Sequence, residues 1–379
     1  MRSARTLNDA GVRIRGDLRD VSGYVPGAST DGAVKLSSNE TSFPPLAGVS
    51  EAIARTAASI HRYPDNNATE LREALAQHWS VSTDSVIVGC GSSLLCQELV
   101  QATCEPGDLV AFGWRSFEAY KLYARAAHAN TLTVPNSGDG SLDLPALARA
   151  INESPITVGI VFLCTPNNPT GASITPAQLV LFLDSIPASI PVVVDEAYQE
   201  FAGSSTVPAV NLYLAGRDNV VMLRTFSKAY GLAGLRVGYA IGDSRILNAV
   251  HAIRSPFSIT AIAQAAALAA LDAQDELGER LMLIRAERDR VRTALASMGI
   301  SSWTSDANFL WLPLGEQSAE FVEHCRSHRV LVRSFAPDGV RVSISTPEEN
   351  NQFLYAAECY SFRLNTATRT ERTSNDSAK

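Results

Sequence analysis

The sequence lacks several features that mark specialised classes of protein. Its 32 Lys and Arg residues stand against 39 Asp and Glu residues, a formal net charge of −7, so it has no cationic excess for a broad contact with nucleic acid. The opening MRSARTLNDAGVRIRGD has no apolar core of the kind found in signal sequences, and no apolar run reaches membrane-spanning length. These absences predict a cytoplasmic protein with neither a nucleic-acid nor a membrane partner.

Cysteine is scarce, and its spacing excludes the common metal sites. The six cysteines among 379 residues are scattered, without a CxxC pair or a histidine at ligand spacing. We therefore expect no metal and interpret the cysteines as small buried residues in a reducing compartment. The sequence also has no internal repeat. With 46% hydrophobic and 19% charged residues, it is typical of an ordinary globular protein, long enough for two lobes.

The middle of the chain predicts an α/β fold. Short β-branched runs alternate there with helical patterns, which is typical of a mostly parallel sheet covered by helices. The predicted strands are 86–88, 109–112, 131–134, 158–164, 191–195, 220–224 and 238–241. Leucines recur on one face of residues 69–79 and 92–104, which predicts two helices facing the core.

A second, smaller α+β domain is predicted after residue 255. An alanine-rich helix (261–272) precedes a helix (276–298) whose alternating Arg and Glu favour a solvated face. Strands at 308–312, 330–333 and 340–344, a helix at 318–326 and a helix from 347 follow. We expect an N-terminal arm (1–34) that contributes to the small domain and a dimer contact, a large domain (35–255), a small domain (256–365) and a disordered tail (366–379), which has no apolar residue larger than alanine.

Two polar segments follow predicted strands at the edge where open α/β sheets bind ligands. CTPNNPTG (164–171) forms a rigid loop that carries Asn168, and the strand at 191–195 ends in Asp195, three residues before Tyr198. Each segment taken alone also fits a simple turn or a helix cap. A buried Asp195 would pair with a cationic ring nitrogen, while Tyr198 would donate to an oxygen on the same ring.

Two further segments supply an amine and a phosphate site. In RTFSKAYGLAGLRVG, Lys228 follows a strand, and its amine could form an imine with an aldehyde cofactor. VGCGSS (88–93) precedes a helix whose N-terminus favours an anion. The residues suited to holding a dianionic phosphate are Ser92, Ser93, Thr225, Ser227 and Arg236. Taken alone, the first segment also fits an ordinary surface lysine and the second an ordinary turn between a strand and a helix. The four segments together indicate pyridoxal 5'-phosphate.

The same segments resemble the motifs of a known family. CTPNNPTG, DEAY and TFSKAYGLAGLRVG resemble those of the fold-type I, class I/II pyridoxal-phosphate-dependent aminotransferases, specifically the histidinol-phosphate aminotransferase family, from about residue 24 to about residue 349. The resemblance implies a fold-type I transferase, in which a large domain with a mostly parallel seven-stranded sheet carries the cofactor and a smaller α+β domain follows.

The resemblance also implies roles for individual residues at the cofactor. Lys228 would bind the cofactor aldehyde and act as the catalytic base, Asp195 would pair with the ring nitrogen, and Asn168 and Tyr198 would contact the ring hydroxyl. Phe117 would stack on the ring. The implied phosphate ligands are Ser92, Ser93, Thr225, Ser227, Arg236 and, from a second subunit, Tyr63. That last role implies a homodimer.

The substrate end of the site follows from the same resemblance. Arg341 would bind the substrate α-carboxylate, and Asn39 lies in the segment that closes over it. Arg333 matches the arginine that histidinol-phosphate members use for the substrate phosphate; with an aromatic substrate it would pair with a glutamate or face solvent. The aromatic residues expected around the site are Tyr24, Phe43, Trp114, Phe117 and Tyr120.

The choice of amino donor depends on a short run near the first glycine-rich turn. GSSL (91–94) lacks the two polar residues that histidinol-phosphate members carry there, whereas GCGSSLLCQ and GWRSFEAY resemble the aromatic amino acid branch of the family. We therefore predict ping-pong transfer from phenylalanine, tyrosine or tryptophan to 2-oxoglutarate. The alternatives are histidinol phosphate as donor, a decarboxylase of the same fold, and a cofactor-binding regulator without catalysis.

Overall fold

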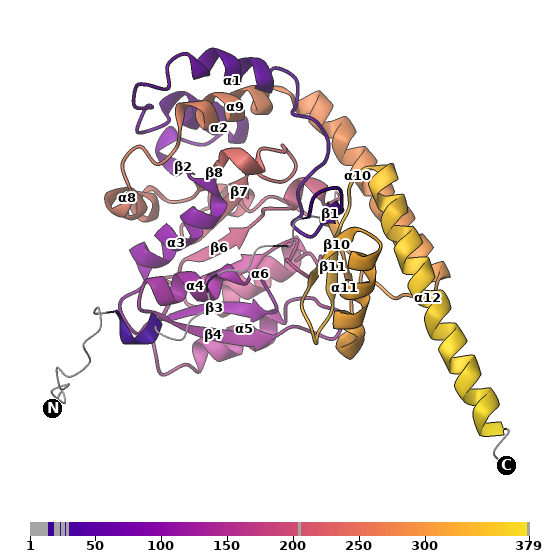
Figure 1. Cartoon of the computed structure of the whole chain (residues 1–379). Helices are drawn as coiled ribbons and strands as arrows, with labels where there is room; N and C mark the ends of the chain where they lie inside the picture. Colours follow the sequence, from indigo (N-terminus) through magenta and orange to yellow (C-terminus); the bar gives the residue numbers. More distant parts are fainter. Residues whose placement is uncertain (1–13, 19–22, 24–26, 28–29, 204–205, 377–379) are drawn as a thin grey trace.

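The structure is a computed structural model that describes residues 14–18, 23, 27, 30–203 and 206–376, with side chains up to residue 362. Figure 1 shows a large sheet with helices on both faces and a small sheet beside it, flanked by the long helices α10 (Gln274–Ser297) and α12 (Pro347–Asp376). The expected α/β architecture is confirmed. No helix within the described ranges is long and apolar enough to cross a membrane.

The large sheet has seven strands in the order β2-β8-β7-β6-β5-β3-β4. These are β2 (Val86–Gly89), β3 (Leu109–Trp114), β4 (Asn130–Pro135), β5 (Val158–Cys164), β6 (Val192–Asp195), β7 (Val220–Thr225) and β8 (Gly238–Ile241). Only β8 runs antiparallel to its neighbours among these strands. The sequence predicted all seven strands and their mostly parallel arrangement.

Alternation along the buried strands separates two layers of helices. In β5, Ile160 and Phe162 pack with α3, α4 and α8, whereas Val161 and Leu163 pack with α5 and α6 on the other face. Successive strand side chains point to opposite faces, so a strand covered on both sides is apolar throughout. The helices of this region are α1 (Val49–Ala57), α2 (Thr69–Trp79), α3 (Gly91–Thr103), α4 (Ala119–Ala126), α5 (Leu144–Asn152), α6 (Pro176–Ser185), α7 (Val210–Leu214) and α8 (Ser244–Ile253).

The small sheet has the order β1-β10-β11-β9. Its strands are β1 (Val34–Leu36), β9 (Phe309–Leu312), β10 (Val330–Ser334) and β11 (Val340–Ser343), and α11 (Ser318–Ser327) packs against β10. β1 pairs in parallel with β10, so residues 35 and 36, which we expected in the large domain, belong to the small sheet. Conversely, α9 (Ala261–Asp272) packs against α1 and α2, although the expected boundary at 256 would assign it to the small domain.

Short 3₁₀ helices complete the fold. They are η1 (Gly16–Leu18), η2 (Thr83–Ser85), η3 (Gln199–Phe201), η4 (Ala233–Leu235) and η5 (Gly315–Gln317). η3 and η4 follow β6 and β7 directly in the chain. They shape the two segments in which Asp195 and Lys228 lie.

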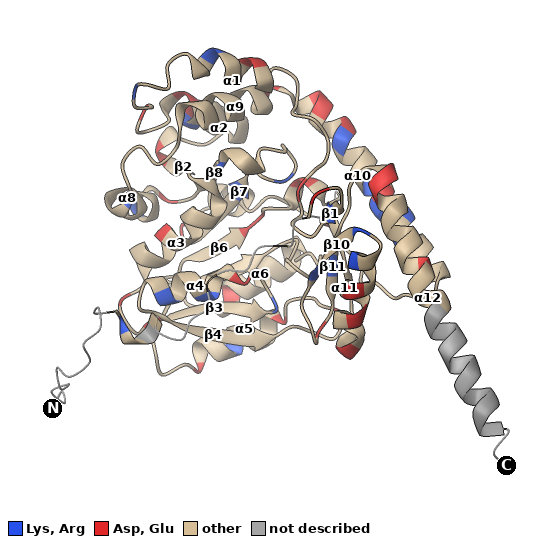
Figure 2. Ribbon diagram, in the orientation of Figure 1, with Lys and Arg blue, Asp and Glu red and all other residues tan. Residues whose placement is uncertain are grey.

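Helix α10 was predicted to present a solvated charged face, and Figure 2 shows acidic and basic residues following one another along it. Two of its arginines are nevertheless buried. Arg280 donates to the carbonyl oxygen of Pro44 at 2.8 Å, and Arg288 donates to that of Ala307 at 2.9 Å. An arginine can be buried when its guanidinium donates to backbone carbonyls and its alkyl chain packs against apolar neighbours. The prediction of a solvated face is therefore wrong for these two residues.

Helix α12 packs against α10 and continues to Asp376. The sequence predicted a disordered tail from residue 366, because that segment offers no large apolar side chain for packing. The helix continues there instead, since each residue added to a formed helix gains a backbone hydrogen bond without a new nucleation cost. Residues 377–379 lie outside the described residues.

All six cysteines are free thiols, and no group of three or more potential metal ligands lies within the described ranges. The expectation that the cysteines are buried is correct for three of them and wrong for the other three. Cys96, Cys164 and Cys325 are buried, whereas Cys90, Cys104 and Cys359 are partly exposed. Cys90 and Cys104 lie at the two ends of α3, where a helix leaves the packed interior.

A buried ion-pair network supports the segment after β6. Glu196 accepts from Arg224 at 2.7 Å and from the backbone N–H of Ala209 at 2.6 Å, and Arg224 also donates to Glu200 at 3.0 Å. Asp195 and Glu196 are successive residues whose carboxylates face different partners, in keeping with strand alternation. The network fixes the backbone that presents Asp195.

We predict that Glu196→Ala lowers the free energy of unfolding by about 3 kcal/mol, because it leaves a buried guanidinium incompletely paired. Urea denaturation measures the change. Glu323→Ala is the matched control, since Glu323 pairs with Arg326 where both side chains are 64% exposed, and its effect should be much smaller because an exposed ion pair contributes little to stability. Equal effects of the two variants would contradict a supporting role for the network.

Candidate active site

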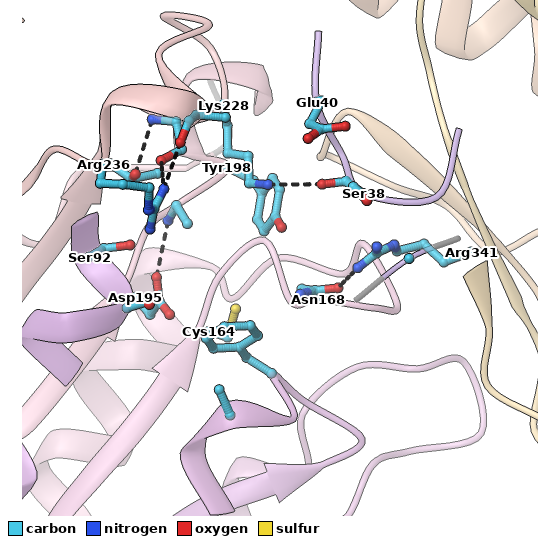
Figure 3. Close-up of a pocket in the computed structure, with 18 of the residues that line it drawn as sticks. Ser38, Glu40, Ser92, Cys164, Asn168, Asp195, Tyr198, Lys228, Arg236 and Arg341 are labelled. Atoms are coloured by element: carbon cyan, nitrogen blue, oxygen red, sulfur yellow. Dashed lines mark hydrogen bonds between the residues drawn. The ribbon is translucent and has the colours of Figure 1, made fainter. Parts of the chain in front are cut away.

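A cavity of about 590 Å³ lies at the carboxyl ends of β5, β6 and β7, where the two sheets meet. Figure 3 shows the side chains that point into it. The predicted site residues that line this cavity are Ser92, Ser93, Phe117, Asn168, Asp195, Tyr198, Thr225, Ser227, Lys228, Arg236 and Arg341. Parallel strands bring their carboxyl ends to one edge, so residues far apart in the sequence converge there.

Asp195 is the last residue of β6 and is 4% exposed. The Tyr120 hydroxyl donates to its Oδ2 at 2.5 Å, and the backbone N–H of Ala197 donates to Oδ1 at 3.3 Å. Burial raises the pKa of the Asp195 carboxyl to about 6, and these hydrogen bonds limit the rise. Asp195 forms no ion pair with any residue that the structure describes, so a cationic group of a ligand would stabilise its ionised form.

Lys228 follows β7 and contributes an amine to the same cavity. Its Nζ donates to the carbonyl oxygen of Ser38 at 3.1 Å. Burial lowers the pKa of Lys228 to about 7, with a further lowering by Arg341 and an opposing effect from Glu40. Roughly half of such an amine is neutral at neutral pH. A neutral lysine amine is both a nucleophile and a base.

An anion site lies beside the N-terminus of α3. Gly91 has φ +77°, and a Cβ there would lie 2.4 Å from Nη2 of Arg236, so this guanidinium depends on a glycine for its position. Arg236 Nη1 donates to Ser227 Oγ at 3.2 Å, and the Ser227 N–H donates to Thr225 Oγ1 at 3.1 Å. The helix N-terminus, the hydroxyls and the guanidinium together suit a dianionic phosphate.

A second arginine enters the cavity from the small sheet. Arg341 in β11 donates through Nη1 to Asn168 Oδ1 and through Nη2 to the carbonyl oxygen of Ser37 at 2.8 Å. Asn39 is buried next to it and donates from Nδ2 to the Tyr198 hydroxyl at 3.0 Å. Burial raises the pKa of Tyr198, so its phenol stays protonated. Asn39 adjoins the cavity without lining it.

Among the described residues, Arg333 does not line the cavity, and neither does Tyr63, which was predicted to act from a second subunit. Tyr63 is 82% exposed and stacks on Phe257 with ring centroids 4.6 Å apart. Arg333 Nη2 donates to Glu118 Oε2 at 3.0 Å, which is the glutamate pairing expected for an aromatic substrate. Tyr24 lies outside the described residues.

The expected aromatic surroundings are correct in part, because Phe117 lines the cavity and the Tyr120 hydroxyl contacts Asp195, whereas Phe43 and Trp114 do not line it. Of the described aromatic residues predicted around the site, only Phe117 lines the cavity. Phe43 packs against the core and lies 5.8 Å from the Arg280 guanidinium, Trp114 carries the Lys121 ammonium over its ring, and Tyr120 is fully buried. Each is an aromatic that its neighbours bury or cover, and sequence proximity to a motif does not reveal this.

The cavity is also lined by residues that were not among the predicted site residues, including Lys35, Ser38, Glu40 and Cys164. A signal was present for two of them, because KLSSNE (35–40) carries both charges in a segment that the family resemblance already placed near the site. Tyr120 was expected near the site as an aromatic residue, but its hydroxyl contact with Asp195 was not predicted, since an aromatic at the start of a helix is usually a core residue.

Tyr120→Phe should raise the pKa of the Asp195 carboxyl further above about 6, by about one pH unit, because the ionised carboxylate loses a hydrogen-bond donor while the ring packing remains. Carboxyl-carbon NMR of the cofactor-free protein measures this pKa. Tyr213→Phe is the control, because its hydroxyl pairs with Ser85 Oγ at 2.8 Å instead. An unchanged pKa in Tyr120→Phe would refute the role given to the phenol.

Comparison with known proteins assigns the chain to a family. The model of the family described as aminotransferase class I and II matches residues 31–357. The chain is 50% identical over 351 residues to a Nocardia farcinica protein named aromatic amino acid aminotransferase, with 92% of this chain and 97% of that protein covered. A Rhodococcus erythropolis protein of the same name is 48% identical over 347 residues, with 92% and 96% covered.

The fold has a close counterpart among solved structures. The histidinol-phosphate aminotransferase of Sinorhizobium meliloti, solved in complex with pyridoxal 5'-phosphate, superposes with a TM-score of 0.85 at 27% identity, over 94% of this chain and 99% of that one. This likeness of fold agrees with the sequence matches. The chain therefore belongs to the aminotransferase class I and II family.

Proposed function

We propose that this chain is a pyridoxal 5'-phosphate-dependent aminotransferase that acts on aromatic amino acids with 2-oxoglutarate as amino acceptor. The observation that carries the proposal is the pairing, in one cavity, of a lysine amine with lowered pKa and a buried carboxylate without an ion-pair partner among the described residues. Relatives 50% and 48% identical to it are named aromatic amino acid aminotransferase, which supports the choice of substrate.

The donor set of the cavity fits the cofactor. Asp195 would pair with the protonated ring nitrogen, Asn168 and Tyr198 would contact the ring oxygen, and Phe117 would stack on the ring face. The phosphate would be held by Ser92, Ser93, Thr225, Ser227 and Arg236. Gly238 supports this fit, because a Cβ there would lie 2.5 Å from the backbone N of Ser92 and would disturb the helix N-terminus that faces the phosphate.

The chemistry divides between the cofactor and the chain. Pyridoxal phosphate supplies an aldehyde that links to amines and a cationic ring that takes up an electron pair. The chain supplies the base: the neutral amine of Lys228 would take the proton from the substrate Cα and pass it to the cofactor within the first half-reaction, and in the second it would deliver a proton to Cα of the acceptor. Asp195 keeps the ring nitrogen protonated by pairing with its charge. The two half-reactions share one cavity, so the kinetics are ping-pong.

The substrate carboxylate and side chain have separate places. Arg341, held by Asn168 and the Ser37 carbonyl, presents a planar guanidinium to the α-carboxylate, and Asn39 supports this end of the site. Ala119, Leu122 and Tyr123 of α4 give the cavity an apolar wall, which suits an aromatic side chain. Arg333 is paired with Glu118 outside the cavity lining, so its placement favours the aromatic donor over histidinol phosphate.

The active form is proposed to be a homodimer in which Tyr63 reaches the phosphate of the neighbouring subunit. The exposed stack of Tyr63 on Phe257 supports this, because a large exposed aromatic pair is typical of an interface rather than of a free surface. We also propose a cytoplasmic location, in keeping with the six free cysteines.

We expect the purified enzyme to favour phenylalanine over histidinol phosphate by roughly 100-fold in kcat/KM, because a phosphate would lack polar partners at the position of Leu94. Steady-state rates with 2-oxoglutarate measure the ratio. Lys228→Ala should abolish turnover with both donors. A clear preference for histidinol phosphate, or release of CO2 in place of an oxo acid, would refute the proposed function.

Tyr63→Phe should weaken the affinity for pyridoxal phosphate roughly tenfold while the dimer persists, because the variant removes one hydroxyl donor and keeps the ring. Fluorescence titration gives the affinity, and analytical ultracentrifugation gives the oligomeric state. Tyr355→Phe, on the exposed side of α12, is the control. A monomeric enzyme with full cofactor affinity would contradict the shared site.

A further inference from the structure

One cation of the cavity has no role in the proposed reaction. Four cationic side chains stand among the described residues that line the cavity: Lys35, Lys228, Arg236 and Arg341. Lys228 is the base, Arg236 faces the phosphate and Arg341 faces the α-carboxylate. Lys35 is left over, although its charge lies close enough to Lys228 to contribute to the lowering of that pKa.

Lys35 is placed by the small sheet. It is the middle residue of β1, which pairs with β10 at Leu331. Leu36, the next residue, is fully buried, so strand alternation turns Lys35 to the opposite side. There the Lys35 ammonium lies beside the cavity and not in the core. The strand fixes the backbone of Lys35, while its long side chain can still move the ammonium group.

Lys35 is paired with Glu40. Figure 3 labels Glu40, which also lines the cavity. The Lys35 Nζ lies 2.8 Å from Glu40 Oε2, and the two side chains are 36% and 43% exposed. An ion pair with this much solvent access contributes little to stability. It can therefore open without a large cost when a competing charge enters the cavity.

The proposed reaction requires the cavity to accept two different side chains. An aromatic donor carries a neutral ring, whereas 2-oxoglutarate and glutamate carry a second carboxylate. An enclosed carboxylate needs a cationic or hydrogen-bonding partner, but an uncompensated cation would disfavour the ring. A lysine that is neutralised by a nearby glutamate meets both requirements, because the lysine can exchange one carboxylate for another.

We propose that the Lys35 ammonium binds the distal carboxylate of the dicarboxylic substrate. When the aromatic substrate is bound, the carboxylate of Glu40 pairs with Lys35 instead. This inference rests on the proposed function. Arg333 is a less suitable partner for this carboxylate, because it is already paired with Glu118 and does not line the cavity. Lys35 is thus a residue that determines specificity for the acceptor.

The experiment compares the two half-reactions of the holoenzyme, followed by the absorbance of the bound cofactor, with glutamate or phenylalanine as the amino donor. Lys35→Met keeps the length of the side chain and removes its charge. It should lower kcat/KM for glutamate relative to phenylalanine roughly 10- to 100-fold. Most of this change should be a higher KM for glutamate. Glu40→Gln should shift the same ratio toward glutamate, roughly three- to tenfold.

Lys121→Met is the matched control, since Lys121 lies over the Trp114 ring and does not line the cavity, and it should leave the ratio unchanged. An unchanged ratio in Lys35→Met would overturn the inference and assign the distal carboxylate to another group, including one from a second copy of the chain. An equal loss of glutamate activity in Lys35→Met and Glu40→Gln would also overturn the inference, because it would show that the ion pair serves only to support the structure. If the unsubstituted enzyme reacted with neither glutamate nor phenylalanine, the proposed function would be refuted together with this inference.

Discussion

The carboxylate of Asp195 is buried at the end of β6 without an ion pair to any described residue, and the rest of the site is arranged around it. Burial of a charge costs free energy that hydrogen bonds from Tyr120 and Ala197 only partly offset. The Glu196 and Arg224 pair holds the backbone beside it. In the proposed function a cationic ring of the cofactor would complete the electrostatics, which accounts for the retention of such a carboxylate in a stable fold.

The junction of the two sheets is the second constraint. The large sheet brings Asp195, Lys228 and the N-terminus of α3 to one edge, while the small sheet contributes Arg341 and, through β1, Lys35. Hydrogen bonds such as that from Arg341 to Asn168 tie the two parts together across the cavity. The large sheet thus carries the residues we propose for the cofactor, and the small sheet carries those we propose for substrate carboxylates.

Much of this arrangement could be predicted from the sequence, because its causes are local. Apolar runs define β5, β6 and β7, and in parallel strands the polar residue after each run must lie at the same edge. Partners distant in sequence could not be predicted in this way. The identity of Glu118 as the glutamate that pairs with Arg333, the hydroxyl contact of Tyr120 and the burial of Arg288 within a charged helix all depend on tertiary packing. The pairing of β1 with the small sheet could not be predicted for the same reason, since its partner β10 lies near the other end of the chain.

The central claim is that Lys228 is the amine to which pyridoxal phosphate is attached. Borohydride treatment of the loaded protein, followed by proteolysis and mass spectrometry, locates the lysine that carries the pyridoxyl group. The account predicts the label on Lys228, whose amine has a pKa of about 7 in this cavity, and no stoichiometric label in Lys228→Ala. Stoichiometric labelling of Lys35 or of any other lysine in the unsubstituted protein would contradict it.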